Sequence, residues 1–262
     1  MEIAIIGGTG VYDPYMLTTS REVKVETPYG AITPTVGEFK GEEVVFLPRH
    51  GSEHSVPPHR VNYQANIWGL RSMGVKRVIS TTAVGSLNPQ MFPGDLVIID
   101  QFIDFTKSRP HTFYEGGEFG VVHVDYTEPY CPEVREVILK AATDLKFKAH
   151  DHGVYVCTEG PRFETPAEIR MFSQLGGDLV GMTNIPEVVL AREAAICYAT
   201  ISMVTNFAAG IAAGPLTHEE VVEIMAKNTE RLKQLIIRSL ETMPKERRCR
   251  CQKAVPEVNR FF

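Results

Sequence analysis

Side chains that can hold a small anion follow four apolar runs of the sequence, where strands are expected to end. Thr9 follows "EIAIIG", Arg49 and His50 follow "EVVFLP", Thr82 closes "KRVISTT", and Thr183 follows "DLVGM". Guanidinium groups, hydroxyls and backbone amides are the donors that bind phosphate. Each of these residues alone is equally typical of a solvated turn. Because ligands bind at the carboxyl ends of strands in α/β sheets, their recurrence predicts an oxyanion site.

The stretch "GGTG" at residues 7–10 has two interpretations. Such turns after a first strand are often only tight turns, whereas bare backbone N–H groups and the Thr9 hydroxyl can cradle an anion. The stretch lacks the G-x-G-x-x-G spacing, and no acidic residue follows the next strand at the required distance. This argues against a dinucleotide-binding fold.

Asn206 interrupts "YATISMVTNFAAG", a run that is otherwise apolar or small. Burying an amide without partners costs roughly 1–3 kcal/mol, so this side chain should bind a ligand or a protein group. Upstream, "CTEGPRFETPAEIR" places Phe163 and Glu164 between a Gly-Pro turn and a helix start. Phe163 either packs in the core or stacks on a planar base. Glu164 either favours the helix N-terminus electrostatically or accepts an N–H of that base.

Alternating strands and helices are expected to position these residues. Aliphatic and β-branched runs predict strands at 2–7, 43–49, 76–82, 95–106, 153–160, 178–183 and 198–206. Residues 21–48 instead show hairpin turns at Tyr29-Gly30 and Lys40-Gly41, which predict added antiparallel strands. The alternation predicts an α/β fold in which helices flank a central mixed, largely parallel sheet, with residues 1–262 forming one domain.

The expected helices are marked by helical spacing of apolar residues and by their first turns. They span 60–73, 132–145, 165–175, 186–195 and 217–242. Pro132 suits the first turn of the second, and Thr165 caps the third. Thr217 and Glu220 form a capping box for the last.

The composition excludes several classes of partner. The 262 residues are 44% apolar and 23% charged, and the net charge of −5 gives no basic field for nucleic acid or a membrane surface. No apolar stretch approaches the ~20 residues that span a bilayer. The start "MEIAIIGGTG" has none of the features of a signal peptide. A cytoplasmic protein without nucleic-acid or membrane partners is therefore expected.

The five cysteines are too few for a secreted disulfide framework in a chain of this length. Cys249 and Cys251 form a C-R-C pair within a C-terminal tail at 244–262. This pair can be two surface thiols, half of a metal site or a tight disulfide. No His or Cys nearby in the sequence completes a metal site, so no metal is expected. A disulfide would hint at a hyperthermophilic source.

Six motifs together resemble the trimeric purine nucleoside phosphorylase family, in the branch that contains the methylthioadenosine phosphorylases. They are "IIGGTG", "PRHG", "TTAVGSLNP", "SRPHTFY", "TEGPRFET" and "GMTNIPEVVLAREAAICYATISMVTN". The resemblance covers roughly residues 2–251, and the C-R-C pair is similar to the C-x-C ending of archaeal members. It implies reversible phosphorolysis: a purine nucleoside and inorganic phosphate, the co-substrate, give free base and ribose 1-phosphate. It also implies no metal or organic cofactor.

The resemblance assigns roles to residues by their positions in these motifs. The phosphate ligands are Thr9, Arg49, His50, Thr82, the Ala83 backbone and Thr183. Met182 packs under the ribose, Phe163 flanks the purine, and Glu164 and Asn206 read its edges. Asn206 and His50 are then the candidate catalytic residues.

The resemblance also implies an assembly and a disulfide. Family members are homotrimers or dimers of trimers (hexamers), and "SRPHTFY" is the segment expected to reach a neighbour's site. Cys131 and Cys197 would be paired, which leaves Cys157 free.

Two positions depart from the methylthioadenosine-specific relatives. Asn206, Phe207 and Ala208 stand where those relatives carry Asp-x-Asp, and Glu164 stands where they carry Ser. An asparagine can accept from a protonated imidazole nitrogen and donate to a 6-oxo group. Glu164 would accept from the ring N–H of a 6-oxopurine and repel the lone pair of adenine. These departures predict inosine and guanosine as substrates, in purine salvage.

Other functions remain open at the level of sequence. His218, in "LTHEEV", either bonds a 5′-hydroxyl or is an idle residue at a helix start. Phosphorylases of methylthioinosine or methylthioadenosine are the alternative enzymes. A hydrolase would not need the phosphate ligands. A different class is a nucleoside-binding or regulatory protein without turnover, and the intact set Arg49, His50, Thr183 and Asn206 argues against it.

Overall fold

The computed structural model describes residues 2–7, 17–51, 55–117, 120–211 and 218–255. Its strands are β1 (Ile3–Gly7), β2 (Thr18–Glu22), β3 (Thr35–Phe39), β4 (Glu42–Pro48), β5 (Arg77–Ser86), β6 (Leu96–Ile98), β7 (Gln101–Phe105), β8 (Ala149–His150), β9 (Val154–Thr158), β10 (Leu179–Gly181) and β11 (Cys197–Phe207). Its helices are α1 (Tyr63–Ser72), α2 (Pro132–Asp144), α3 (Pro166–Gln174), α4 (Glu187–Glu193) and α5 (His218–Thr242), with 3-10 turns η2 (Pro58–Arg60) and η4 (Arg250–Lys253).

All of these strands join one sheet. Its main path runs β2-β3-β4-β1-β5-β10-β9-β7, and β11 pairs with β5 and with β6, which in turn pairs with β8. Strands β1, β4, β5 and β11 run parallel to one another. Strands β7, β9 and β10 are parallel to each other but antiparallel to β5. The prediction of a mixed, largely parallel α/β sheet is therefore confirmed.

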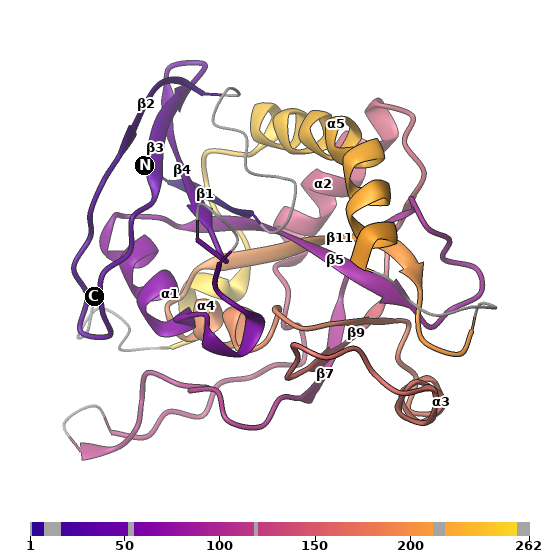
Figure 1. The fold of residues 1–262 in the computed structure, drawn as a ribbon. Helices are drawn as coiled ribbons and strands as arrows, with labels where there is room; N and C mark the ends of the chain where they lie inside the picture. Colours follow the sequence, from indigo (N-terminus) through magenta and orange to yellow (C-terminus); the bar gives the residue numbers. More distant parts are fainter. Residues whose placement is uncertain (1, 8–16, 52–54, 118–119, 212–217, 256–262) are drawn as a thin grey trace.

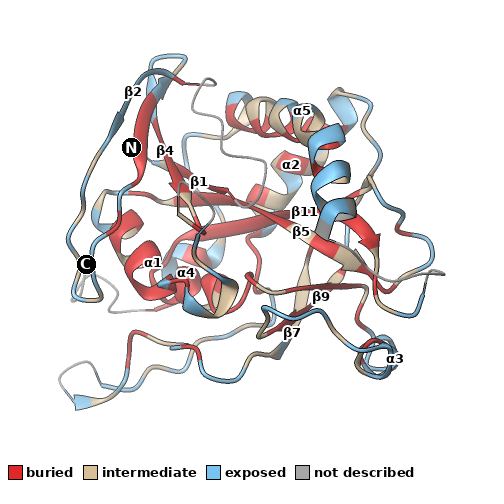
Figure 2. Cartoon of the chain, viewed as in Figure 1, coloured by how far each residue is buried: buried red, intermediate tan, exposed pale blue. Residues whose placement is uncertain are grey.

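Helices cover both faces of the sheet because the buried strands are apolar on both sides. In β1, Ala4 and Ile6 face α1 and α4, while Ile5 faces α2 and α5. Figure 1 shows these two helix pairs on opposite sides of the sheet. In Figure 2, β11 is almost wholly buried, whereas α3 is largely exposed at the edge.

The helix starts follow the capping chemistry in the sequence. At α3 the Thr165 hydroxyl accepts from the Glu168 N–H at 3.2 Å, and the Glu168 carboxylate accepts from the Thr165 N–H at 2.7 Å. Pro132 opens α2, as predicted. Thr217 lies outside the described residues, so the cap predicted for α5 is not described.

Two predicted strands have different bounds. The run 95–106 forms two strands, β6 and β7, because Asp100 leaves the ladder and its carboxylate accepts from the Gly153 N–H at 2.8 Å. The run expected to end at Thr82 continues to Ser86, since β11 pairs with it along its whole length. The hairpins at Tyr29-Gly30 and Lys40-Gly41 are both present, the second joining β3 to β4.

The cysteines differ from expectation. All five are free, so the Cys131–Cys197 disulfide implied by the resemblance is not formed, and neither is one within C-R-C. Cys251 is not a surface thiol: it is buried, because η4 packs onto the core formed by α2, α5 and β11. No helix among the described residues is both long enough and apolar enough to cross a membrane.

Candidate active site

A cavity of about 500 Å³ opens where β4, β5, β10 and β11 converge. It gathers most of the residues singled out in the sequence. The lining comprises Arg49, His50, Ser55, Val56, Pro57, Pro58, Thr82, Ala83, Val84, Gly85, Phe163, Glu164, Val180, Gly181, Met182, Thr183, Thr205, Asn206, Ala208 and Ala209. Its volume is in the range of small-molecule sites.

Asn206 lies in the cavity wall at an irregularity of β11. The register with β5 shifts between Val204 and Asn206, as at a β-bulge. Consecutive side chains of a regular strand point to opposite faces, whereas at this shift both Thr205 and Asn206 line the cavity. A Cβ on Gly85 would lie 3.2 Å from Asn206 Nδ2, so a glycine there gives the amide room.

Two neighbours hold the amide of Asn206 in one orientation. Its Oδ1 accepts from the Thr205 hydroxyl at 2.7 Å, and its Nδ2 donates to the Phe207 carbonyl at 2.9 Å. One lone pair on Oδ1 and one N–H on Nδ2 remain after these bonds. The amide can therefore accept from one group of a ligand and donate to another.

Arg49 is bound by a carboxylate that the sequence analysis did not identify. Its Nε and Nη2 donate to the two oxygens of Glu187 at 2.7 and 2.8 Å. It also donates to the Thr81 carbonyl at 2.9 Å and the Ser80 hydroxyl at 2.6 Å. Among the described residues these bonds occupy four of the five N–H groups of the guanidinium. One N–H on Nη1 is left for a ligand.

This ion pair is buried, since Arg49 and Glu187 side chains are 1% and 0% exposed. Burial alone would lower the pKa of Arg49, but the Glu187 carboxylate more than compensates and raises the pKa above its usual value. Glu187 also accepts from the hydroxyls of Tyr198 at 2.6 Å and Ser80 at 3.1 Å. A signal existed in the sequence, because an acid inside the apolar run "IPEVVLA" should need a buried partner.

The remaining donors, Thr82, His50 and Thr183, also line the cavity. The Thr82 hydroxyl shares a hydrogen bond of 2.9 Å with Ser202. His50 Nδ1 lies 2.8 Å from the Val56 carbonyl, which can only accept, so Nδ1 carries a proton. The Thr183 N–H donates to the Tyr155 hydroxyl at 3.4 Å. Thr183 follows β10, which runs against β5, so it reaches the cavity from the opposite direction to Thr82.

Glu164 and Phe163 occupy the wall that follows β9. The Thr158 hydroxyl donates to Glu164 at 2.6 Å. Burial raises the pKa of the Glu164 carboxyl, and the bond from Thr158 only partly opposes this. Phe163 is 42% exposed, so its ring is available at the rim and does not pack in the core.

Met182 is placed by the turn that precedes Phe163. Gly160 there has φ +67°, and a Cβ on it would lie 2.6 Å from the sulfur of Met182. The turn therefore requires glycine both for its backbone conformation and for its approach to Met182.

The other three residues of the predicted site are Phe207, Thr9 and His218. Phe207 does not line the cavity; its ring packs edge-on against Phe92, with centroids 5.8 Å apart. Thr9 lies outside the described residues. His218 is the first residue of α5, and its side chain is not among those described.

The segment "SRPHTFY", residues 108–114, is tied to the body by buried polar contacts. Arg109 donates to the carbonyls of Ile185, Thr158 and Glu159 at 2.6–3.1 Å. On α4, Glu193 accepts from the Phe113 N–H and the Thr112 hydroxyl, each at 2.7 Å. Arg109 thus connects the ends of β9 and β10, on which Glu164 and Thr183 depend.

Comparison with known proteins gives a consistent family. The sequence pattern of the phosphorylase superfamily matches residues 2–241. A probable 6-oxopurine nucleoside phosphorylase of Moorella thermoacetica is 60% identical, covering 98% of this chain and 99% of the relative. The 6-oxopurine nucleoside phosphorylase of Pyrococcus furiosus is 57% identical, covering 97% of each chain.

A solved structure shares the fold as well. The crystal structure of a methylthioadenosine phosphorylase from an antarctic soil metagenomic library has a TM-score of 0.90 at 39% identity, over 97% of this chain and 90% of that one. The resemblance inferred from the motifs is thus confirmed. By sequence over nearly its full length, and by fold, this chain belongs to the phosphorylase superfamily.

Proposed function

We propose that this enzyme catalyses the reversible phosphorolysis of 6-oxopurine nucleosides, inosine and guanosine, to free base and ribose 1-phosphate. The observation that carries the proposal is one cavity that is lined both by N–H and O–H donors suited to an anion and by Asn206 and Glu164. The names of the relatives at 57–60% identity support the same substrate class.

Phosphate would bind among the N–H and O–H donors that line the cavity. The donors are the remaining N–H of Arg49, the hydroxyls of Thr82 and Thr183, His50 and the Ala83 backbone, with Thr9 as a further candidate. In the reaction the bond between C1′ and the purine nitrogen breaks as C1′ becomes a cation-like centre, and a phosphate oxygen then bonds to C1′. The phosphate oxygens stabilise that centre electrostatically before they attack it.

The purine leaves with the bonding electron pair, so its ring must be stabilised as an anion or protonated. Asn206 would accept from the imidazole N–H with Oδ1 and donate to the 6-oxo group with Nδ2. It would use the lone pair and the N–H that its bonds to Thr205 and Phe207 leave unoccupied. Glu164 would accept the N–H of the six-membered ring. Phe163 would lie against the base, Met182 under the ribose and His218 toward the 5′-hydroxyl.

The proposal includes an assembly and a location. We place the chain in a homotrimer or a dimer of trimers, with residues 106–128 against a neighbour. Their described part forms no α-helix or β-strand, and Val121 within it is 72% exposed.

Five free cysteines fit a reducing compartment, so we propose a cytoplasmic location for the one-domain chain. The chemistry above needs phosphate as a co-substrate and no cofactor.

The decisive assay measures hypoxanthine release from inosine with and without phosphate. We expect release only with phosphate, together with one ribose 1-phosphate for each hypoxanthine. Release of free ribose without phosphate would instead indicate a hydrolase. A parallel ratio of kcat/KM for inosine, guanosine, adenosine, methylthioinosine and methylthioadenosine tests the base and the 5′ position separately.

The pH dependence should differ between 6-oxopurine and 6-aminopurine nucleosides. Because burial raises the pKa of Glu164, its carboxyl stays protonated to a higher pH than an exposed one. As pH rises through that pKa the carboxylate forms and can accept the ring N–H of inosine, so kcat/KM for inosine should rise. The protonated acid can donate to the adenine lone pair, so the inosine-to-adenosine ratio should fall toward acid pH.

Glu164→Gln is the matched variant for this pH prediction. Its amide does not titrate, so the ratio should become flat with pH. Taking a ratio cancels the titration of phosphate itself, which is common to both substrates. An unchanged slope in the variant would assign the titration to another group.

A further inference from the structure

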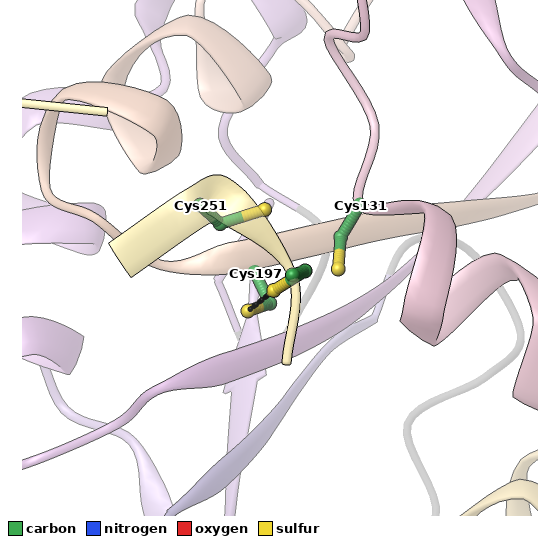
Figure 3. Close-up of side chains that lie close together, drawn as sticks. Cys131, Cys197 and Cys251 are labelled. Atoms are coloured by element: carbon green, nitrogen blue, oxygen red, sulfur yellow. Dashed lines mark hydrogen bonds between the residues drawn. The ribbon is translucent and has the colours of Figure 1, made fainter. Parts of the chain in front are cut away.

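Four cysteines that are far apart in the sequence meet at one place in the fold. Cys131 precedes α2, Cys197 begins β11, Cys249 precedes η4 and Cys251 lies within η4. Their four sulfurs all lie within 4.8 Å of one another. Figure 3 shows the side chains of Cys131, Cys197 and Cys251 converging. No residue close to the C-R-C pair in the sequence completes a metal site, but the fold brings two more thiols beside it.

The spacing of the sulfurs favours a metal cage over disulfides. All five cysteines are free, and the sulfurs of Cys197 and Cys249 lie 3.3 Å apart, whereas a disulfide requires about 2.05 Å. Zinc binds thiolates at about 2.3 Å, and a tetrahedron of that size separates its sulfurs by about 3.8 Å. The cluster has the size of such a tetrahedron, and its four ligands would fill the coordination of a structural zinc site.

A positively charged side chain, Arg192, lies beside the cluster. Such a charge stabilises thiolates, whereas a disulfide is neutral and does not require it. Arg192 on α4 donates from Nη1 to the sulfur of Cys251 at 3.5 Å. Arg192 is 8% exposed, and its Nε has no hydrogen-bond partner among the described residues. A zinc ion with four thiolates carries two negative charges, which a buried guanidinium bonded to sulfur stabilises. Cys131, Cys197 and Cys251 are buried, so the site is closed to water on most sides.

We propose that Cys131, Cys197, Cys249 and Cys251 bind one zinc ion, which fastens the C-terminal segment to the start of α2 and β11. Each thiol gives up its proton on binding, so zinc uptake releases protons and weakens at acid pH. No sulfur is oxidised. The site is structural and lies apart from the cavity, so the inference does not depend on the proposed reaction.

The test is the metal content of the full chain, purified with a reductant and without chelators from zinc-supplemented cells. We expect one zinc ion per chain, and thiol titration after denaturation with a chelator should find all five thiols. Cobalt replacing zinc should give the thiolate charge-transfer and intense visible bands of tetrahedral cobalt. This spectrum needs no variant and reports the ligands directly.

Cys249→Ser removes the least buried ligand and is the variant expected to fold. Loss of groups that merely support a ligand already weakens metal binding by about 10–100-fold, so its affinity for zinc, measured by competition with a chelator, should fall by at least that factor. Cys157→Ser is the control, since Cys157 is buried outside the cluster and should leave zinc unchanged. Fewer than five thiols with no metal would establish disulfides and overturn the proposal. Five thiols that take up neither zinc nor cobalt would overturn it too.

Discussion

Replacing Asn206 by aspartate should reverse the preference of the enzyme between keto and amino purines. The change removes the N–H of Nδ2 that we propose donates to the 6-oxo group, and it places a second acceptor oxygen there. Losing one such donor in a preorganised site costs roughly 10²–10³-fold in rate, so kcat/KM for inosine should fall by about that factor. A 6-amino group can donate to the new carboxylate, so adenosine turnover should rise. Steady-state kinetics on both nucleosides at one phosphate concentration measures the ratio.

Asn228→Asp is the matched control for this change. Asn228 is as buried as Asn206, each being 9% exposed, but it lies on α5 outside the cavity. The control should keep the native ratio of kcat/KM for inosine to kcat/KM for adenosine. It should show the same general loss of stability that a buried charge causes. An Asn206→Asp variant with the same ratio as the control would contradict the proposal that this amide reads the edge of the base.

Replacing Glu187 by glutamine should destabilise the protein strongly and make its thermal stability depend on the phosphate concentration. The change leaves the guanidinium of Arg49 buried without its counter-charge, and breaking a buried pair in this way costs about 3–5 kcal/mol. For a chain of this length that lowers Tm by on the order of 10 °C. A phosphate ion bound next to Arg49 would supply the missing charge. Thermal unfolding at increasing phosphate should therefore show a larger rise in Tm for the variant than for the native protein.

Glu193→Gln provides the comparison on the same helix. Glu193 is also buried but accepts from the Phe113 N–H and the Thr112 hydroxyl, both neutral, and burial raises the pKa of its carboxyl. A neutral amide there should cost about 1–2 kcal/mol at most, with an ordinary phosphate response. Equal Tm values and equal phosphate responses in the two variants would argue against a special role for the Arg49–Glu187 pair.

The sequence predicts well what depends on local patterns. Pro132 and Thr165 mark helix starts because the first turn of a helix has specific chemical needs. The sequence also points to Arg49, His50 and Thr183, which line the cavity, because a polar group that ends an apolar strand has few reasons to be there. Local patterns also predict the hairpins, since a turn such as Lys40-Gly41 imposes its own backbone conformation.

What depends on pairing between distant segments could not be predicted. The length of β5 is set by β11, which pairs with it along ten residue pairs, so Thr82 lies within the strand and not at its end. The register shift beside Asn206 is a property of two strands, and it leaves Phe207 outside the cavity. Glu187 and Arg49 are 138 residues apart in the sequence. The members of the cysteine cluster also come from distant parts of the sequence, and no periodicity predicts that either group meets.

The full compensation of Arg49 by Glu187 has an electrostatic consequence for any anion in the cavity. Among the described lining residues Arg49 is the one arginine or lysine, and its charge is already balanced. An incoming oxyanion is thus oriented by dipoles but not neutralised. A phosphate bound there as we propose would keep its negative charge and would stabilise the sugar ring, which becomes positive only at the moment of bond cleavage. The site would therefore stabilise the transition state more than the bound substrate.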